Sequence, residues 1–340
     1  MPSSLRPSLD RLPAKSIRPI ASLVVLALSL TAVVARASDG VIELNQACAT
    51  QTGCAPGDDP GFPITLTARG SYRLTSDLEM PNANTNGIQV GADDVTLDFN
   101  GFTLFGPAFV PIDTHVCSLS TTGVGISPIA PTAPAALVVE HGRIRGMAKG
   151  ISFPAADVRV ERMTVERNCG DGVTLGTAAL VVDSQFRANS GNGLVVGTGG
   201  RVRDSIADNN GDSGIFLGTG GLVTGCIATT NGEWGVNFDG KGGVASGNSL
   251  VGNQLDGVSF FQGGVATGNA ASGNGWNGIS AHEGAVVVGN SAHENHQTGI
   301  FSFPTTGIGL NATYANGGGG LGFGVQIACN VGDVGVATCP

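Results

Sequence analysis

The chain has 340 residues, of which 55 are glycine and 5% are aromatic, and its net charge is −9. Residues 1–37 hold five basic residues and one acidic residue, so the remainder carries a net charge of −13. Such an acidic chain is not expected to bind nucleic acid or an anionic membrane. The glycines show no three-residue period, which excludes a collagen-like helix.

Residues 1–37 have the pattern of a secretion signal peptide. Basic residues come first, then an apolar run at 20–34, and then the A-x-A cleavage pattern Ala35-Arg36-Ala37. The basic residues are Arg6, Arg11, Lys15 and Arg18. A membrane anchor is the alternative, but the run is short for a spanning helix. The sequence therefore predicts export to the periplasm or the extracellular space, with no membrane span after signal removal.

The cysteines are interpreted as disulfide partners, because export permits disulfides. The predicted pairs are Cys48–Cys54, Cys329–Cys339 and Cys117–Cys169. Cys226 falls in an inward-facing column of the repeat described below, which predicts a buried free thiol. The cysteine spacings match no zinc-ligand pattern, so we expect no metal and no cofactor.

Residues 38–63 are expected to form an N-terminal cap over the end of the repeat that follows. In that repeat a glycine followed by an apolar residue returns every 21 or 22 residues. These glycines are Gly150, Gly172, Gly193, Gly214, Gly235, Gly257, Gly278, Gly299 and Gly320. The first and third positions after them are almost wholly apolar, as in Val173 and Leu175, and the second is mixed. Two-residue alternation of this kind predicts a strand with one face in a core.

An asparagine stands four residues before each of these glycines from Gly172 onwards. The eight asparagines are Asn168, Asn189, Asn210, Asn231, Asn253, Asn274, Asn295 and Asn316. Stacked amides hydrogen-bond along a stack, so this column predicts a buried asparagine ladder at a turn. A second ladder is expected nine residues before the glycine, at Asn248, Asn269, Asn290 and Asn311.

A period of about 21 residues is too short for a strand with a crossover helix and shows no helical pattern. It predicts an all-β fold, a parallel β-helix of about ten coils at 64–325. The segments GSYRLTSDL (70–78), NGIQVGADDVTLDFNGFTLFG (86–106) and HGRIRGMAKGI (141–151) look like first coils. With the repeat, they resemble the pectin-lyase-like superfamily, and this resemblance implies a right-handed parallel β-helix. The proline-rich stretch 107–135 is interpreted as an inserted loop, and 326–340 as a C-terminal tail.

Three sets of residues are candidates for a functional site. Asp183 and Asp204, on adjacent coils near Asp208, could form an acid/base carboxylate pair, although an ion ladder with Arg162, Glu166 and Arg187 is the alternative. A histidine-rich pair of coils could bind a metal or supply a general base. It holds His282, Glu283, His293, Glu294 and His296. Trp234 and Trp276, two coils apart, could stack sugar rings together with Phe216 and Phe301, or could simply pack locally.

The preferred interpretation is an exported, monomeric β-helix scaffold or binding protein that contacts glycans at the cell surface. The alternative is a polysaccharide lyase or glycoside hydrolase acting on an extracellular polysaccharide. The resemblance implies that a calcium-dependent pectate lyase needs clustered carboxylates and a catalytic Arg or Lys beside its groove. Here the outward column after the glycine has no charged residue, and Lys241 is the only Lys or Arg after Arg203. These departures favour binding over catalysis.

Overall fold

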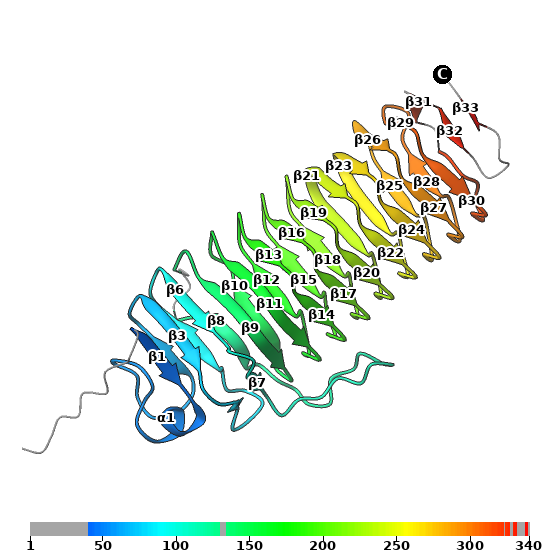
Figure 1. Cartoon of the computed structure of the whole chain (residues 1–340). Helices are drawn as coiled ribbons and strands as arrows, with labels where there is room; N and C mark the ends of the chain where they lie inside the picture. The colour runs from blue at the N-terminus through cyan, green and yellow to red at the C-terminus, as the bar shows by residue number, and fades with distance from the viewer. Residues whose placement is uncertain (1–39, 130–133, 323, 327–328, 332–336, 339–340) are drawn as a thin grey trace, which may run out of the picture. The chain divides into compact units, whose positions relative to one another are not determined.

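The computed structural model describes residues 40–129, 134–322, 324–326, 329–331 and 337–338. Its strands wind into a parallel β-helix with three stacks of strands (Figure 1). The segment interpreted as a signal peptide lies outside the described residues. We name the three stacks A, B and C, in the order in which each coil passes through them.

The A stack begins directly after the repeat glycines and holds eleven strands, close to the ten coils expected. Its strands are β2 (Ile64–Leu66), β5 (Ile88–Val90), β8 (Val124–Pro128), β10 (Lys149–Phe153), β12 (Val173–Leu175), β15 (Leu194–Val196), β18 (Ile215–Leu217), β21 (Val236–Ser246), β23 (Val258–Thr267), β25 (Ile279–Ala281) and β28 (Ile300–Ser302).

The B stack follows, and the long strands β21 and β23 run from A into B. Its other strands are β1 (Val41–Leu44), β3 (Gly70–Leu74), β6 (Val95–Asp98), β9 (Val138–Arg145), β11 (Arg159–Glu166), β13 (Leu180–Val182), β16 (Arg201–Arg203), β19 (Leu222–Thr224), β26 (Ala285–Val288), β29 (Gly307–Gly309) and β31 (Val325–Gln326).

The C stack completes each coil and shares β9 and β11 with B. Its other strands are β4 (Leu78–Glu79), β7 (Thr103–Phe105), β14 (Gln185–Arg187), β17 (Ile206–Asp208), β20 (Ile227–Thr229), β22 (Ser249–Val251), β24 (Ala270–Ser272), β27 (Ser291–His293), β30 (Ala312–Tyr314) and β32 (Asn330–Val331). The strand β33 (Ala337–Thr338) pairs antiparallel with β32.

The core lies inside the three stacks and is made of the predicted apolar columns. Val173 and Leu175 point inward while Thr174 between them stays half-buried, and most coils repeat this pattern. Large side chains stack on their own column, as Phe238 and Phe260 do with ring centroids 4.8 Å apart and planes 2° from parallel. Burial of these columns is the main source of stability, at roughly 25 cal/mol per Å² of apolar surface.

Both asparagine ladders are present and buried. The Asn231 amide donates to Asn253 Oδ1 at 2.9 Å and to the Ala207 carbonyl at 3.1 Å, and the members from Asn189 to Asn295 repeat these two contacts. The second ladder continues beyond the predicted residues, because the Asn311 amide donates to Asn330 Oδ1 at 3.1 Å. Cys226 occupies this column as a buried free thiol, as expected, and burial raises its pKa to about 11.

The first described residues pair with the coils and carry the one helix. Strand β1 pairs with β3, and helix α1 (Gln46–Gln51) follows it. Asn45 caps this helix by accepting the Cys48 backbone N–H at 2.9 Å, and Cys48 is joined to Cys54. This part of the chain therefore covers strand edges at the first coil.

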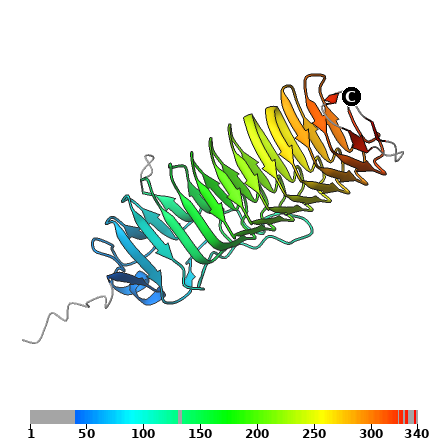
Figure 2. The same ribbon diagram turned by 45° about the horizontal axis from the view of Figure 1, so that its top comes forward.

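The irregular segment between β7 and β8 is shorter than the expected 107–135. Residues 124–128 form β8, which pairs with β5 and β10, and Pro128 ends that strand opposite Val90. Proline fits at a strand end because it removes only one ladder donor there. Residues 107–122, here called the strap, run beside the C stack (Figures 1 and 2). The predicted disulfide Cys117–Cys169 ties the strap to the coils. Cys339, the expected partner of Cys329, lies outside the described residues.

Candidate functional site

A hollow of about 350 Å³ lies on the A stack, and its lining residues come from four successive coils. We call it the aromatic hollow. Its lining residues are Trp234, Asp256, Ser259, Trp276, Asn277, Ser280, His282, Gln297 and Phe301. Ser259, Ser280 and Phe301 are register partners on β23, β25 and β28, so one outward column forms the strand side of the hollow.

The opposite side of the hollow is the turn directly before the repeat glycine. At this position Asp171 and Asn192, and again Asp256 and Asn277, form a short third ladder, in which each side chain accepts the backbone N–H of the next coil. Asn277 donates its backbone N–H to Asp256 Oδ1 at 2.9 Å and its side-chain amide at 2.8 Å. Thr298 then donates its N–H to Asn277 Oδ1 at 3.1 Å. The ladder therefore fixes Asp256 and Asn277 in place, with carboxyl and amide groups facing the hollow.

Asp256 is the buried titratable group of this site, with only 4% of its surface exposed. Burial disfavours its charged form and raises its pKa, although hydrogen bonds from Asn277 and Trp234 and the nearby His282 oppose the rise. Asp171 holds the same position four coils earlier, but Lys149 Nζ lies 2.8 Å from its Oδ2. Burial also acts against ionisation of Asp171, yet the bonds from Lys149 and Asn192 outweigh it and lower its pKa.

Aromatic rings border the aromatic hollow and continue into a second one. Trp276 is 48% exposed, and Trp234 and Phe301 are half-buried. Phe303 meets Phe301 edge-to-face with centroids 5.7 Å apart, and it contacts His282 at 4.6 Å. The neighbouring hollow of about 300 Å³ is lined by Phe261, Gln262, His282, Glu283 and Phe303. A concave surface with exposed ring faces and a few fixed polar groups has the composition of a small-ligand site.

Three of the four predicted aromatic residues therefore come together. Trp234, Trp276 and Phe301 line the aromatic hollow. Phe216 lies further along the same outward column, beside Asn237, and is not among the lining residues. Sequence reasoning missed Asp256, although a signal was available. It is an acidic residue in a column held mostly by amides and hydroxyls, and unlike Asp171 it stands in a part of the chain almost without Lys or Arg.

The predicted carboxylates lie elsewhere. Asp183 and Asp204 are exposed turn residues between B and C strands, with φ of 49° and 51°. Asp208 lies on the C stack and accepts the Thr229 hydroxyl at 2.8 Å. A catalytic role for these three residues stays a prediction. In the expected ion ladder Arg187 does reach Glu166, with 3.8 Å between the charged groups, but Arg162 turns away from Asp183 and pairs with Glu161.

The histidine-rich coils are split over different parts of the β-helix. His282 lines both hollows, whereas His293 lies on β27 of the C stack and His296 lies in an exposed turn. Among the residues that the structure describes, they belong to no group of three possible metal ligands. The coils therefore offer one histidine to the candidate site.

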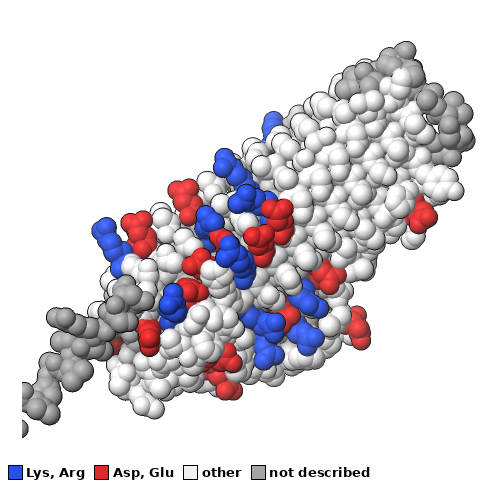
Figure 3. Space-filling model, in the orientation of Figure 1, with Lys and Arg blue, Asp and Glu red and all other residues white. Residues whose placement is uncertain are grey.

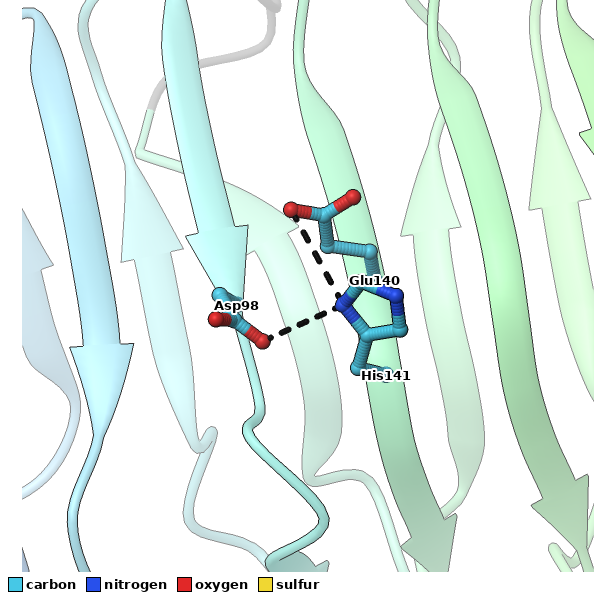
Figure 4. Close-up of side chains that lie close together, drawn as sticks. All are labelled: Asp98, Glu140 and His141. Carbon is cyan, nitrogen blue, oxygen red and sulfur yellow. Dashed lines mark ion pairs between the residues drawn. The ribbon is translucent and has the colours of Figure 1, made fainter.

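A separate polar cluster joins Asp98, Glu140 and His141 at the surface of the B stack (Figure 4). His141 Nδ1 lies 3.4 Å from Asp98 Oδ1 and 4.0 Å from Glu140 Oε1. Arg162 donates to His141 Nε2 at 2.6 Å, so the ring proton sits on Nδ1 and faces the carboxylates. Arg73 also binds Asp98, at 3.0 Å. Both ring nitrogens are thus engaged, and the Arg73 guanidinium already compensates Asp98.

Charged side chains gather on the coils nearer the N-terminus, and the visible surface nearer the C-terminus is largely uncharged (Figure 3). The sequence gives the reason, because Lys241 is the only Lys or Arg after Arg203. The aromatic hollow therefore lies where the chain supplies almost no cation.

Comparison with known proteins agrees with this architecture. A family model described as "Right handed beta helix region" matches residues 76–222. The A-module of the Azotobacter vinelandii mannuronan C-5 epimerase AlgE4 superposes with a TM-score of 0.58, at 14% identity, over 82% of this chain and 85% of that one. The fold is a right-handed parallel β-helix.

Further solved structures share this β-helix at similarly low identity. The Dettilon tailspike protein matches with a TM-score of 0.56 and 10% identity, over 78% of this chain and 60% of the tailspike. A double mutant of the periplasmic alginate epimerase AlgG matches with a TM-score of 0.54 and 13% identity, over 84% of both chains. A search of curated proteins finds no match. At these identities the likeness establishes the fold alone.

Two further features bear on where the protein works. The disulfides Cys48–Cys54 and Cys117–Cys169 are typical of an oxidising compartment. Within the part of the chain that the structure describes, no helix has the length and apolar character needed to cross a bilayer.

Proposed function

We propose that this chain is an exported, monomeric β-helix protein that binds a glycan in the aromatic hollow. The observation that carries the proposal is the half-exposed Trp276, which stands with Trp234 and Phe301 around a hollow floored by fixed polar groups. The apolar face of a sugar ring packs on an aromatic ring, and its hydroxyls pair with Asp256, Asn277 and Ser280. Small-ligand sites usually combine aromatic contacts of this kind with a few fixed polar groups.

Binding fits the arrangement better than turnover does. A glycoside hydrolase needs two carboxyl groups on either side of one scissile bond. Asp183 and Asp204 occupy turns between B and C strands, whereas the aromatic rings lie on the A stack. The aromatic surface and the acidic surface are therefore different surfaces. Export is supported by the disulfides and by the signal pattern in residues 1–37.

The proposal is tested by replacing the exposed ring, as Trp276→Ala. The protein is run on native gels that contain a panel of soluble polysaccharides, and binding is read as retardation. We expect the variant to lose a few-fold to about tenfold in affinity, because an exposed aromatic contact contributes about 0.5–1.5 kcal/mol. Its melting temperature should stay close to that of the wild type, since almost half of the side chain is in solvent.

The matched control is Tyr314→Ala, which removes a 66% exposed ring from β30 of the C stack. It should leave retardation unchanged. Equal retardation of the wild type and Trp276→Ala would rule out the aromatic hollow as the glycan site. Release of sugar products by the wild type would favour the lyase or hydrolase alternative.

A further inference from the structure

We infer that the glycan bound in the aromatic hollow is uncharged, and that Asp256 excludes polyuronates from it. This inference rests on the proposed glycan-binding function and names its ligand class. It is carried by the position of Asp256, by the charges around it, and by the other occupants of its column.

The charges around the hollow are the first step. The ionisable groups that line the two neighbouring hollows are Asp256, His282 and Glu283. Lys241 is exposed and pairs in register with Gln262 at the border of the second hollow, but it lines neither hollow, and Asp239 is on the same strand. A polyuronate carries a carboxylate on each sugar and would find no Lys or Arg lining this surface.

The burial of Asp256 is the second step. Its carboxyl is withdrawn from water, so a ligand carboxylate beside it would meet a like charge that solvent screens poorly. A sugar hydroxyl meets no such penalty, because it both donates and accepts a hydrogen bond. It can therefore pair with Asp256 whether that group is charged or protonated.

The third step is that the fold does not need a carboxyl at this position. Asn192 and Asn277 occupy the same column and accept the N–H of the following coil through their amide oxygens. An asparagine at 256 would keep the bonds from Asn277 and remove a buried charge. The other aspartate of the column, Asp171, is compensated by Lys149 and lies outside the hollow. Asp256, the aspartate without a Lys or Arg partner, is therefore the one that lies beside the aromatic rings.

The experiment compares the wild type with Asp256→Asn and with Glu294→Gln, which removes the same charge at an exposed turn. Each protein is run on native gels containing neutral glucan, mannan, galactan or xylan, or the polyuronates polygalacturonate or alginate. The polyuronate gels are run with and without about 1 mM calcium, since calcium bridges carboxylates. Melting temperatures confirm that each variant is folded.

We expect the wild type to be retarded by at least one neutral polysaccharide and by neither polyuronate. Asp256→Asn should strengthen polyuronate binding by about tenfold or more, while Glu294→Gln should match the wild type. Wild-type binding to a polyuronate, or no gain in Asp256→Asn, would overturn this inference but keep glycan binding. Absence of any retardation of the wild type would overturn the proposed function itself.

Discussion

Asp171 and Asp256 hold equivalent positions in the β-helix, yet their surroundings act on them in opposite directions. Asp171 binds Lys149 and its pKa is lowered, whereas Asp256 has no cation partner among the residues described and its pKa is raised by burial. A single column thus holds one carboxyl that stabilises the fold when charged and one that costs stability when charged.

This contrast predicts opposite pH dependences for two matched substitutions. The raised pKa of Asp256 means that its contribution is present in acid and is lost as pH rises through the folded pKa. Asp256→Asn should therefore gain stability relative to the wild type as pH rises from about 3 to 7. The lowered pKa of Asp171 means that its contribution is present at neutral pH and is lost in acid. Asp171→Asn should lose stability relative to the wild type over the same rise.

Thermal melting across this pH range measures both effects, with the wild type scanned in parallel. Two difference curves of the same sign would contradict the assignment of opposite environments to the two carboxyls.

The asparagine ladder makes a second prediction at this scale. Asn253 is buried, and its side chain accepts from Asn231 at 2.9 Å and donates to Asn274 at 3.0 Å and to the Ala228 carbonyl at 3.0 Å. Asn253→Ala leaves buried donors and acceptors without partners, so we expect a loss of about 1–3 kcal/mol in unfolding free energy. Denaturant unfolding measures it.

Gln254→Ala is the control, because Gln254 is the exposed neighbour of Asn253. It should change the unfolding free energy by less than about 0.5 kcal/mol. Similar denaturation midpoints for the two variants would mean that the ladder contributes little to stability.

At the scale of elements, the strap is the part of the chain that does not follow the repeat. Residues 107–122 contain no strand, and Phe109 and Val116 are 50% and 67% exposed. Val110 of the strap is fully buried, and hydrogen bonds at several points hold the strap to the coils. His115 Nε2 lies 2.8 Å from the Asn209 carbonyl, Asn209 donates to the Ile112 carbonyl at 3.1 Å, and Arg167 lies over the Phe109 ring. The disulfide Cys117–Cys169 adds the covalent attachment.

Removal of this disulfide should therefore release the strap and leave the coils intact. We expect the double variant Cys117→Ser with Cys169→Ser to be cut by chymotrypsin within 107–122 at least about tenfold faster than the wild type. The cleaved protein should retain its β-rich circular dichroism. Mass spectrometry of the fragments locates the cut, and equal cleavage rates would mean that the noncovalent contacts alone hold the strap.

At the scale of the whole molecule, the β-helix could be predicted from sequence, and most of the site could not. A ladder needs the same chemistry on every coil, so Asn168 to Asn316 recur at a fixed interval and reveal the period. A ligand site needs residues that break the repeat, such as Asp256 among amides. Such a site is detected only when the partners of the two aspartates are known, because Lys149 binds Asp171 and no Lys or Arg among the described residues binds Asp256.

The strap and β8 show the same limit. Prolines in 107–135 indicated a loop, but residues 124–128 pair with both neighbouring coils and belong to the A stack. Composition marks where the repeat is interrupted, whereas the resumption of strand pairing depends on the register set by neighbouring coils.

The asparagine ladders also have a direction. Each bond between successive members runs from the amide nitrogen of the earlier coil to the oxygen of the later coil, from Asn168 to Asn316 in one ladder and from Asn248 to Asn330 in the other. Aligned amide dipoles add, so the two ladders make an electrically polar axis with unlike ends. The negative, oxygen end of the first ladder faces the coils before Asn168, where Asn168 Oδ1 accepts the Met147 backbone N–H at 3.1 Å, and its positive end faces the last coils.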